Sequence, residues 1–200
     1  MGNISRREML ARLGAGLGAA MVPALPALAR ARAQAAVGDT FIMFNAAEAE
    51  TVRAVVARII PSDQSGPGAL EARADRYIDR ALSGALRTAR PAYTTGLAAI
   101  NAAAQSSKGA ALAKLPAVDQ DAVLIQIEGT MFFNLIRNHT IQGTFSDPFY
   151  GGNANFAGWD LIGYPGARMT VAANLQRMDR KPEPSRKSAY DYSMFSKGEN

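Results

Sequence analysis

Hydrophobic residues from Asn45 onward recur at the spacing of amphipathic helices. Asn45 stands where a helix N-cap is expected, and Glu48 follows three residues later, as a capping box requires. The next apolar positions occur at i, i+3, i+4, i+7 and i+8, which places them on one helical face: Val52, Val55, Val56, Ile59 and Ile60. Pro61 then ends the pattern. The sequence therefore predicts a first helix with a single apolar face over residues 46–60.

Further helical patterns follow. Gly68–Leu82 is amphipathic, with a mixed-charge face that we expect to be solvated, and a third helix is predicted from Pro91 to about Gln105. A fourth is predicted from about Asp119 past Phe133, because apolar residues repeat there every four positions, at Val123, Ile127, Met131 and Leu135. A short helix is expected over Met169–Met178. Alternating apolar and polar residues never run beyond four positions, so we predict a mainly α fold, a small bundle of four or five helices.

The pattern changes in the stretch Met131–Gly166. It holds eight of the 15 aromatic residues, the single Trp and the single His. Gly143–Gly166 has no helical or strand period, yet its aromatic content is unlike that of disordered segments. Long irregular loops in compact domains usually serve a function. We therefore expect a long, ordered, aromatic- and Gly-rich loop that forms the working surface of the protein.

The same stretch carries a family resemblance. Its segments read RNHT from Arg137, FSDP from Phe145, YGGN from Tyr150, GW at Gly158-Trp159 and IGYPG from Ile162. This string closely resembles the small subunit, subunit 3, of gluconate 2-dehydrogenase and the related gamma subunits of sugar and polyol dehydrogenases. With looser matches upstream, the resemblance spans roughly residues 44–166. It implies an accessory subunit whose large partner carries FAD, with electrons passing to a c-type cytochrome subunit that holds haem c.

The amino-acid composition excludes several kinds of binding site and cofactor attachment on this chain. The net charge is +5, but residues 1–35 hold five of the 22 basic residues and one of the 17 acidic ones, which leaves only +1 on residues 36–200. A nearly neutral body has no electrostatic footprint for nucleic acid. The absence of cysteine excludes disulfides, thiolate metal sites and covalently attached haem. We expect no cofactor and no metal on this chain.

Residues 1–35 have the features of an export signal. Ser5, Arg6 and Arg7 precede an Ala-, Leu- and Gly-rich run, and the paired arginines resemble the twin-arginine (Tat) motif. Met9 and Ala11 depart from that motif, so an ordinary Sec signal and an uncleaved anchor remain alternatives. The prediction is a periplasmic protein exported by the Tat translocase, associated with the inner membrane through its complex. Residues 36–178 would form one domain, and residues 179–200 a flexible or partner-wrapping tail.

Catalytic groups are few in the aromatic loop. His139 and Asp147 are the only plausible acid–base pair, and neither lies in a nucleophile or metal-ligand motif. For His139 we favour a role in capping a helix end and bonding the following loop. Asp147, directly before Pro148, is typical of a turn. No catalytic residue is expected on this chain.

The loop is instead suited to contact with a partner, because large rings and close-packing glycines favour interfaces. The candidate interface residues are His139, Phe145, Asp147, Phe149, Tyr150, Asn153, Phe156, Trp159 and Tyr164. The structural alternative is that these rings close the core of the chain itself. Two functional hypotheses follow: an accessory subunit that escorts and stabilises a flavoprotein dehydrogenase, or a free-standing periplasmic binding protein or hydrolase that uses the His139–Gly166 loop as a pocket.

Overall fold

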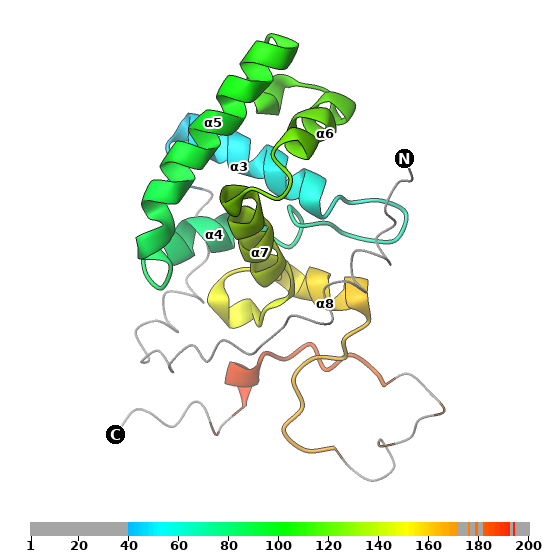
Figure 1. Cartoon of the computed structure of the whole chain (residues 1–200). Helices are drawn as coiled ribbons and strands as arrows, with labels where there is room; N and C mark the ends of the chain where they lie inside the picture. The colour runs from blue at the N-terminus through cyan, green and yellow to red at the C-terminus, as the bar shows by residue number, and fades with distance from the viewer. Residues whose placement is uncertain (1–39, 172–175, 177–178, 180–181, 193, 195–200) are drawn as a thin grey trace.

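A computed structural model describes residues 40–171, 176, 179, 182–192 and 194 (Figure 1). The predicted signal residues Ser5, Arg6 and Arg7 lie outside the described residues. The α-helices are α3 (Ala46–Ile59), α4 (Ala74–Leu82), α5 (Arg90–Lys108), α6 (Ala117–Gln126), α7 (Met131–Phe145) and α8 (Ala157–Ile162). Short 3-10 helices are η1 (Arg87–Ala89), η2 (Leu112–Lys114), η3 (Pro148–Tyr150), η4 (Ala154–Phe156) and η6 (Ala189–Asp191). Residues 40–171 contain no β-strand, so the mainly α prediction is confirmed.

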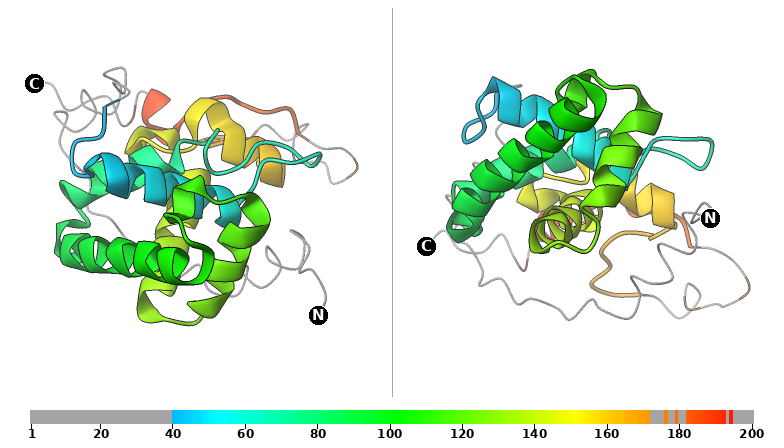
Figure 2. Two further views of the ribbon diagram at one scale, coloured as in Figure 1. Left: turned by 90° about the horizontal axis from the view of Figure 1, so that it is seen from above. Right: turned by 45° about the horizontal axis from the view of Figure 1, so that its top comes forward.

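Helix α3 is the centre of the bundle, with α4, α5, α6 and α7 packed around it (Figures 1 and 2). Its predicted capping box is present: the Asn45 side chain accepts from the Glu48 backbone N–H at 2.9 Å, and Glu48 accepts in return from Asn45 N–H at 3.0 Å. The predicted apolar face is buried, with Val52, Val55 and Val56 fully enclosed. The capping box thus fixes where α3 begins, and burial of its apolar face fixes which side of the helix faces the core.

The predicted fourth helix is wrong in one respect: it is two helices, α6 and α7. Gly129, with φ +88, lies between them, and the Thr130 side chain caps α7 by accepting from the Phe133 N–H at 3.2 Å. The turn changes the direction of the chain, so Met131, which the four-residue repeat places in the core, is 91% exposed. A glycine in the left-handed region followed by a capping Thr outweighs the apolar repeat.

Helix α4 departs from the prediction that its charged face is solvated. Asp75 and Asp79 are buried, and Asp79 accepts the backbone N–H groups of Ile42, Met43 and Phe44 at 2.7, 2.9 and 2.9 Å. A carboxylate that accepts three backbone donors is well satisfied in the interior. Asp79 therefore fixes the segment that leads into α3.

Boundaries elsewhere differ by a few residues. The second helix begins at Ala74 rather than Gly68, and α5 extends to Lys108, where Gly109 takes the left-handed C-cap conformation. Met169–Val171 are not helical, contrary to the predicted short helix, and most of the remaining predicted span lies outside the described residues. Within the described residues, no helix combines the length and hydropathy that crossing a membrane requires.

Candidate functional site: the aromatic loop

The loop that follows α7 folds back against the end of that helix, and it contains η3, η4 and α8 rather than being irregular throughout (Figure 1). Two of its glycines touch the backbone of α7. A Cβ added to Gly152 would lie 2.0 Å from the Gly143 oxygen, and one added to Gly158 would lie 1.8 Å from the Thr144 oxygen. These positions exclude any side chain, so the Gly-rich motif is a requirement of close backbone packing.

Asn153 is the polar centre of the loop. It is fully buried with φ +46, and its backbone N–H donates to the Gly143 oxygen at 2.7 Å. Its side-chain amide donates to the Ser146 oxygen at 2.9 Å, while Oδ1 accepts from the backbone N–H of Gly158 at 2.8 Å. Asn153 therefore connects the end of α7 to the start of α8, with both its amide nitrogen and its amide oxygen hydrogen-bonded within the chain.

Trp159 is buried where the loop packs on the end of α7. Its ring is 6% exposed, and its indole Nε1 donates to the Phe145 oxygen at 2.9 Å. Phe156 and Tyr164 pack against it with ring centroids at 5.4 and 5.0 Å. These rings therefore pack on one another within the chain, and the indole N–H is satisfied internally.

Asp147 joins the loop to the C-terminal segment. Its Oδ1 accepts from the Phe149 N–H at 2.9 Å, which confirms the predicted turn role. The same carboxylate accepts from the Ser188 hydroxyl at 2.5 Å and from the Ala189 N–H at 2.8 Å. Arg186 adds an ion pair to Asp160 at 2.8 Å.

We call residues 182–192 the C-terminal arm. The arm runs along the loop of the same chain (Figure 1). The sequence predicts a flexible or partner-wrapping tail over residues 179–200. Within the chain, the arm bonds to the Asp147 and Asp160 carboxylates and to the backbone oxygens of Asn155 and Ala167. The role of residues 179–200 as a flexible or partner-wrapping tail stays a prediction.

His139 lies within α7 and not at its end, so the predicted capping role is wrong. Its Nδ1 is 3.0 Å from the Tyr93 hydroxyl of α5, and the two rings stack at 5.8 Å with an interplanar angle of 8°. Burial lowers the pKa of His139 from 6.5 to about 4 and raises the pKa of Tyr93. The imidazole is therefore neutral near pH 7, and it contacts Tyr93 while Asp147 contacts the arm, so the two candidate acid–base residues do not form a pair.

The nine candidate interface residues differ in exposure. His139, Phe149, Asn153 and Trp159 are buried. Phe145, Asp147, Tyr150 and Phe156 are half-buried, and Tyr164 is 43% exposed. Most of the ring area that suggested a docking surface is thus used inside the chain.

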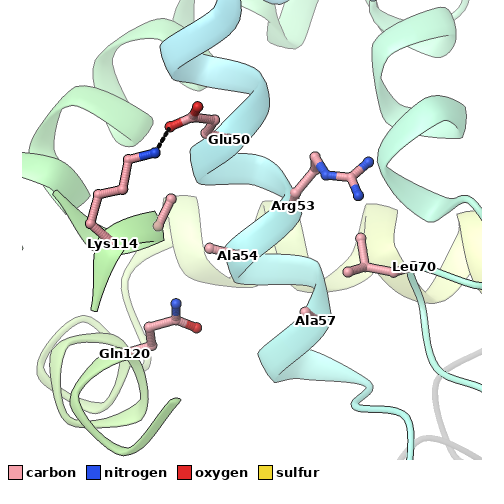
Figure 3. Close-up of a pocket in the computed structure, with 8 residues that line it drawn as sticks. Glu50, Arg53, Ala54, Ala57, Leu70, Lys114 and Gln120 are labelled. Atoms are coloured by element: carbon pink, nitrogen blue, oxygen red, sulfur yellow. Dashed lines mark ion pairs between the residues drawn. The ribbon is translucent and has the colours of Figure 1, made fainter. Parts of the chain in front are cut away.

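A hollow of about 360 Å³ lies on the other side of the bundle, over α3 (Figure 3). Ala54 and Ala57 form its floor, and the Glu50–Lys114 ion pair of 3.0 Å stands at one edge. The remaining lining residues are Arg53, Leu70, Ala113 and Gln120. None of them belongs to residues 139–166, so this hollow is not the pocket that the binding-protein hypothesis places in the loop.

Burial of the acidic residues Asp75 and Asp79 of α4 is not evident from their spacing in the sequence. Asp75 pairs with Arg53 at 3.1 Å, and burial raises its pKa despite the nearby charges of Arg53 and Arg76. Spacing alone could not separate these acids from solvated neighbours, because their partners come from residues 42–53. Among the described residues, no cluster of three or more His, Asp or Glu side chains is placed to hold a metal ion.

Comparison with known protein families identifies one match. The family model for gluconate 2-dehydrogenase subunit 3 matches residues 46–166. The chain belongs to the gluconate 2-dehydrogenase subunit 3 family. The match begins with α3 and ends at Gly166, so it covers α3 to α8 and confirms the resemblance inferred from the motifs. The family name describes one subunit of a multi-subunit dehydrogenase. Neither the curated proteins nor the solved structures contain a match to this chain.

Proposed function

We propose that this chain is the non-catalytic small (gamma) subunit of a periplasmic FAD-dependent sugar or polyol dehydrogenase. In this proposal the large subunit binds FAD and oxidises the substrate, and a c-type cytochrome subunit with haem c receives the electrons. The small subunit stabilises the flavoprotein and escorts it through the Tat translocase.

The observation that carries the proposal is the extent of the family match. It runs over residues 46–166, from the first residue of α3 to the last residue of the aromatic loop. The family relationship therefore applies to the whole helical body and not to one appended segment. We therefore propose the subunit role for the whole helical body.

The polar groups of the loop are consistent with an accessory role. Asn153 and Asp147 use their side chains to hold backbone N–H and C=O groups, and His139 is enclosed with Tyr93. Acid–base catalysis needs a titrating group within reach of a substrate. Each of these side chains is therefore engaged within the chain: Asn153 holds the loop on α7, Asp147 holds the arm, and His139 contacts Tyr93 of α5.

A tagged version of the chain tests the proposal. The chain is produced in its native host, purified through a C-terminal affinity tag and compared with the chain produced alone. We expect the first eluate to contain a flavin-bearing large polypeptide and to reduce a dye in the presence of a sugar or polyol. The chain alone is expected to show neither flavin absorbance nor dye reduction. Sugar-dependent dye reduction by the pure single chain would overturn the proposal.

A further inference from the structure

Arg80 of α4 packs against the aromatic loop at Gly151. Helix α4 lies beside α7, and the loop begins where α7 ends (Figure 1). A Cβ added to Gly151 would lie 2.5 Å from Nη1 of Arg80, 3.1 Å from its Cζ and 3.4 Å from its Nε. The guanidinium group therefore lies directly on the glycine, in space that any other residue at this position would fill with its own side chain.

One nitrogen of this guanidinium group lacks an acceptor. Nη1 of Arg80 is buried and has no hydrogen-bond partner within the described part of the chain. The charge of Asp79 reaches Arg80, but the Asp79 carboxylate accepts instead from the backbone N–H groups of residues 42–44. Burial lowers the pKa of Arg80, because it disfavours the charged form. A buried donor that finds no acceptor in its own chain is uncommon and needs an explanation.

Other half-buried arginines of the fold are paired with carboxylates. Arg58 donates to Asp121 through two hydrogen bonds of 2.6 and 2.7 Å, and Arg90 donates to Glu48 at 2.8 Å. The Arg58 pair has the bidentate geometry in which a guanidinium group matches a carboxylate best. Arg80 has the same chemistry and is also half-buried, but the described residues offer it no such carboxylate.

A second arginine adds positive charge on the same side of α4. Arg76 precedes Arg80 by four residues, so the two side chains leave the helix in similar directions. Cζ of Arg76 lies 3.7 Å from the centroid of the Phe41 ring. Asp75 is 3.1 Å from Arg53 but 3.8 Å from Arg76, so it neutralises this side of α4 only in part. Like charges one helical turn apart repel, and an anion bound beside them offsets the repulsion.

The surroundings of Arg80 favour a carboxylate over a phosphate group. Phosphate sites direct several backbone N–H groups at the anion. In the turn beside Arg80 such groups are already used, because the N–H groups of Gly151, Asn153 and Ala154 donate to carbonyl oxygens of the chain. The open side of a half-buried guanidinium group remains, and it matches the two oxygens of a single carboxylate.

We propose that Arg80, packed on Gly151, is a binding site for a carboxylate group. The carboxylate belongs to an organic acid in solution or to an Asp or Glu side chain of the large flavoprotein subunit. Only the second source rests on the proposed function. In both cases the ligand supplies the acceptor that the described part of the chain does not, and Gly151 leaves room for the arginine.

A titration with acetate tests the site on the single chain. Nitrogen–proton NMR spectra follow the Nε–H signals of the arginines while sodium acetate replaces sodium chloride at constant ionic strength. The signal of Arg80 is expected to shift and to saturate, whereas that of Arg87, which is exposed on η1, should not saturate. Inorganic phosphate at the same ionic strength should bind at least about tenfold more weakly. Phosphate that binds as tightly as acetate would overturn the assignment to carboxylates.

The tagged purification tests the large subunit as the source. Arg80→Gln removes the charge, Arg80→Lys keeps a charge without the paired N–H groups, and Arg87→Gln is the matched control. If the carboxylate belongs to the large subunit, bound flavin per small subunit should fall by at least about tenfold in both Arg80 variants and stay unchanged in the control. Melting temperatures of the lone variants show whether a loss comes from misfolding. If Arg80→Gln melts lower than the wild type, Arg80→Lys decides.

The outcomes distinguish the two sources. Saturable acetate binding with wild-type flavin in the Arg80 variants supports an organic acid, and flavin loss in the Arg80 variants alone supports the large subunit. Without acetate binding, wild-type flavin in both Arg80 variants, or an equal loss in Arg87→Gln, would overturn the proposal. If the tagged wild-type chain carries no flavoprotein, the proposed function fails, and the acetate titration alone then decides whether Arg80 is a carboxylate site.

Discussion

Buried polar residues of the family motif make hydrogen bonds within the chain, and several of these bonds go to backbone groups. Asn153 is fully enclosed and bonds three backbone groups of the chain, while His139 shares a buried hydrogen bond with Tyr93. A buried amide satisfied in this way fixes local geometry, because each lost bond leaves an unpaired group that costs about 1–3 kcal/mol. At this scale, the motif residues serve to specify structure.

Stability should depend on pH through His139. Its pKa in the folded chain is about 4, below the unfolded value of 6.5, so the unfolded chain binds a proton that the folded chain excludes. The free energy of unfolding should therefore be fully retained above about pH 6.5 and fall towards pH 4. At about 1.4 kcal/mol per unit of pKa, the loss from this group amounts to about 3 kcal/mol.

The variant His139→Asn isolates this effect, because Asn keeps an acceptor for Tyr93 and does not titrate. Urea unfolding of both proteins between pH 4 and pH 8 measures it. The difference in stability between wild type and variant should be constant above pH 7 and shrink, or reverse, towards pH 4. A difference that does not change with pH would show that the folded chain admits the proton.

At the scale of elements, the contact between the loop and α7 depends on glycine. Gly158→Ala would place a methyl group 1.8 Å from the Thr144 oxygen, so the loop must move off α7. Overpacking against side chains lowers stability by about 1–3 kcal/mol. Because the Thr144 oxygen belongs to the backbone and cannot move aside as a side chain can, we expect a loss of about 3 kcal/mol or more. Gly84→Ala is the matched control, because nothing lies within 4 Å of its added Cβ. Thermal melts should show a loss of several degrees for Gly158→Ala and little change for Gly84→Ala.

The C-terminal arm should be released by Asp147→Asn. The substitution keeps the turn at Phe149, since Asn also forms such turns, but it replaces a carboxylate that accepts from both Ser188 and Ala189. We expect limited proteolysis within residues 182–192 to accelerate by about tenfold, which corresponds to about 1.4 kcal/mol. Asp63→Asn changes a second turn aspartate, which accepts from the Ser65 N–H at 2.6 Å, and should leave the arm protected. Equal cleavage in the two variants would mean that Asp147 does not hold the arm.

Sequence periodicity predicted the helices that bury a single apolar face in the core. The stripe of α3 and its capping box are present, and Tyr93, Leu97 and Ile100 of α5 are buried as expected. Prediction was poorer where a helix-ending residue interrupts the apolar repeat. Gly129 does so between α6 and α7. It was also poorer where partners are remote in sequence, because the spacing around Asp79 and Asp147 contains no information about residues 42–44 or 188–189.

For the whole molecule, the helical body and the proposed export signal of residues 1–35 lead to separate predictions. Residues 46–166 form a bundle that belongs to a subunit family, and the twin arginines lie in residues 1–35. If the Tat motif exports the complex, one leader serves two proteins, because Tat carries partners that fold before export. Export of the flavoprotein should then depend on Arg6 and Arg7 of this chain.

Changing Arg6→Lys together with Arg7→Lys should strand both this chain and its flavoprotein in the cytoplasm. The matched control is Arg12→Lys with Arg30→Lys, which makes the same chemical change twice within residues 1–35 and leaves Arg6 and Arg7 intact. Cell fractionation with immunodetection of the chain and a dye-linked dehydrogenase assay measures both proteins. Periplasmic activity is expected to drop by about tenfold or more in the motif variant alone. A small subunit retained in the cytoplasm beside a normally exported, active flavoprotein would contradict the escort role, whereas normal export of both would point to a Sec-type leader.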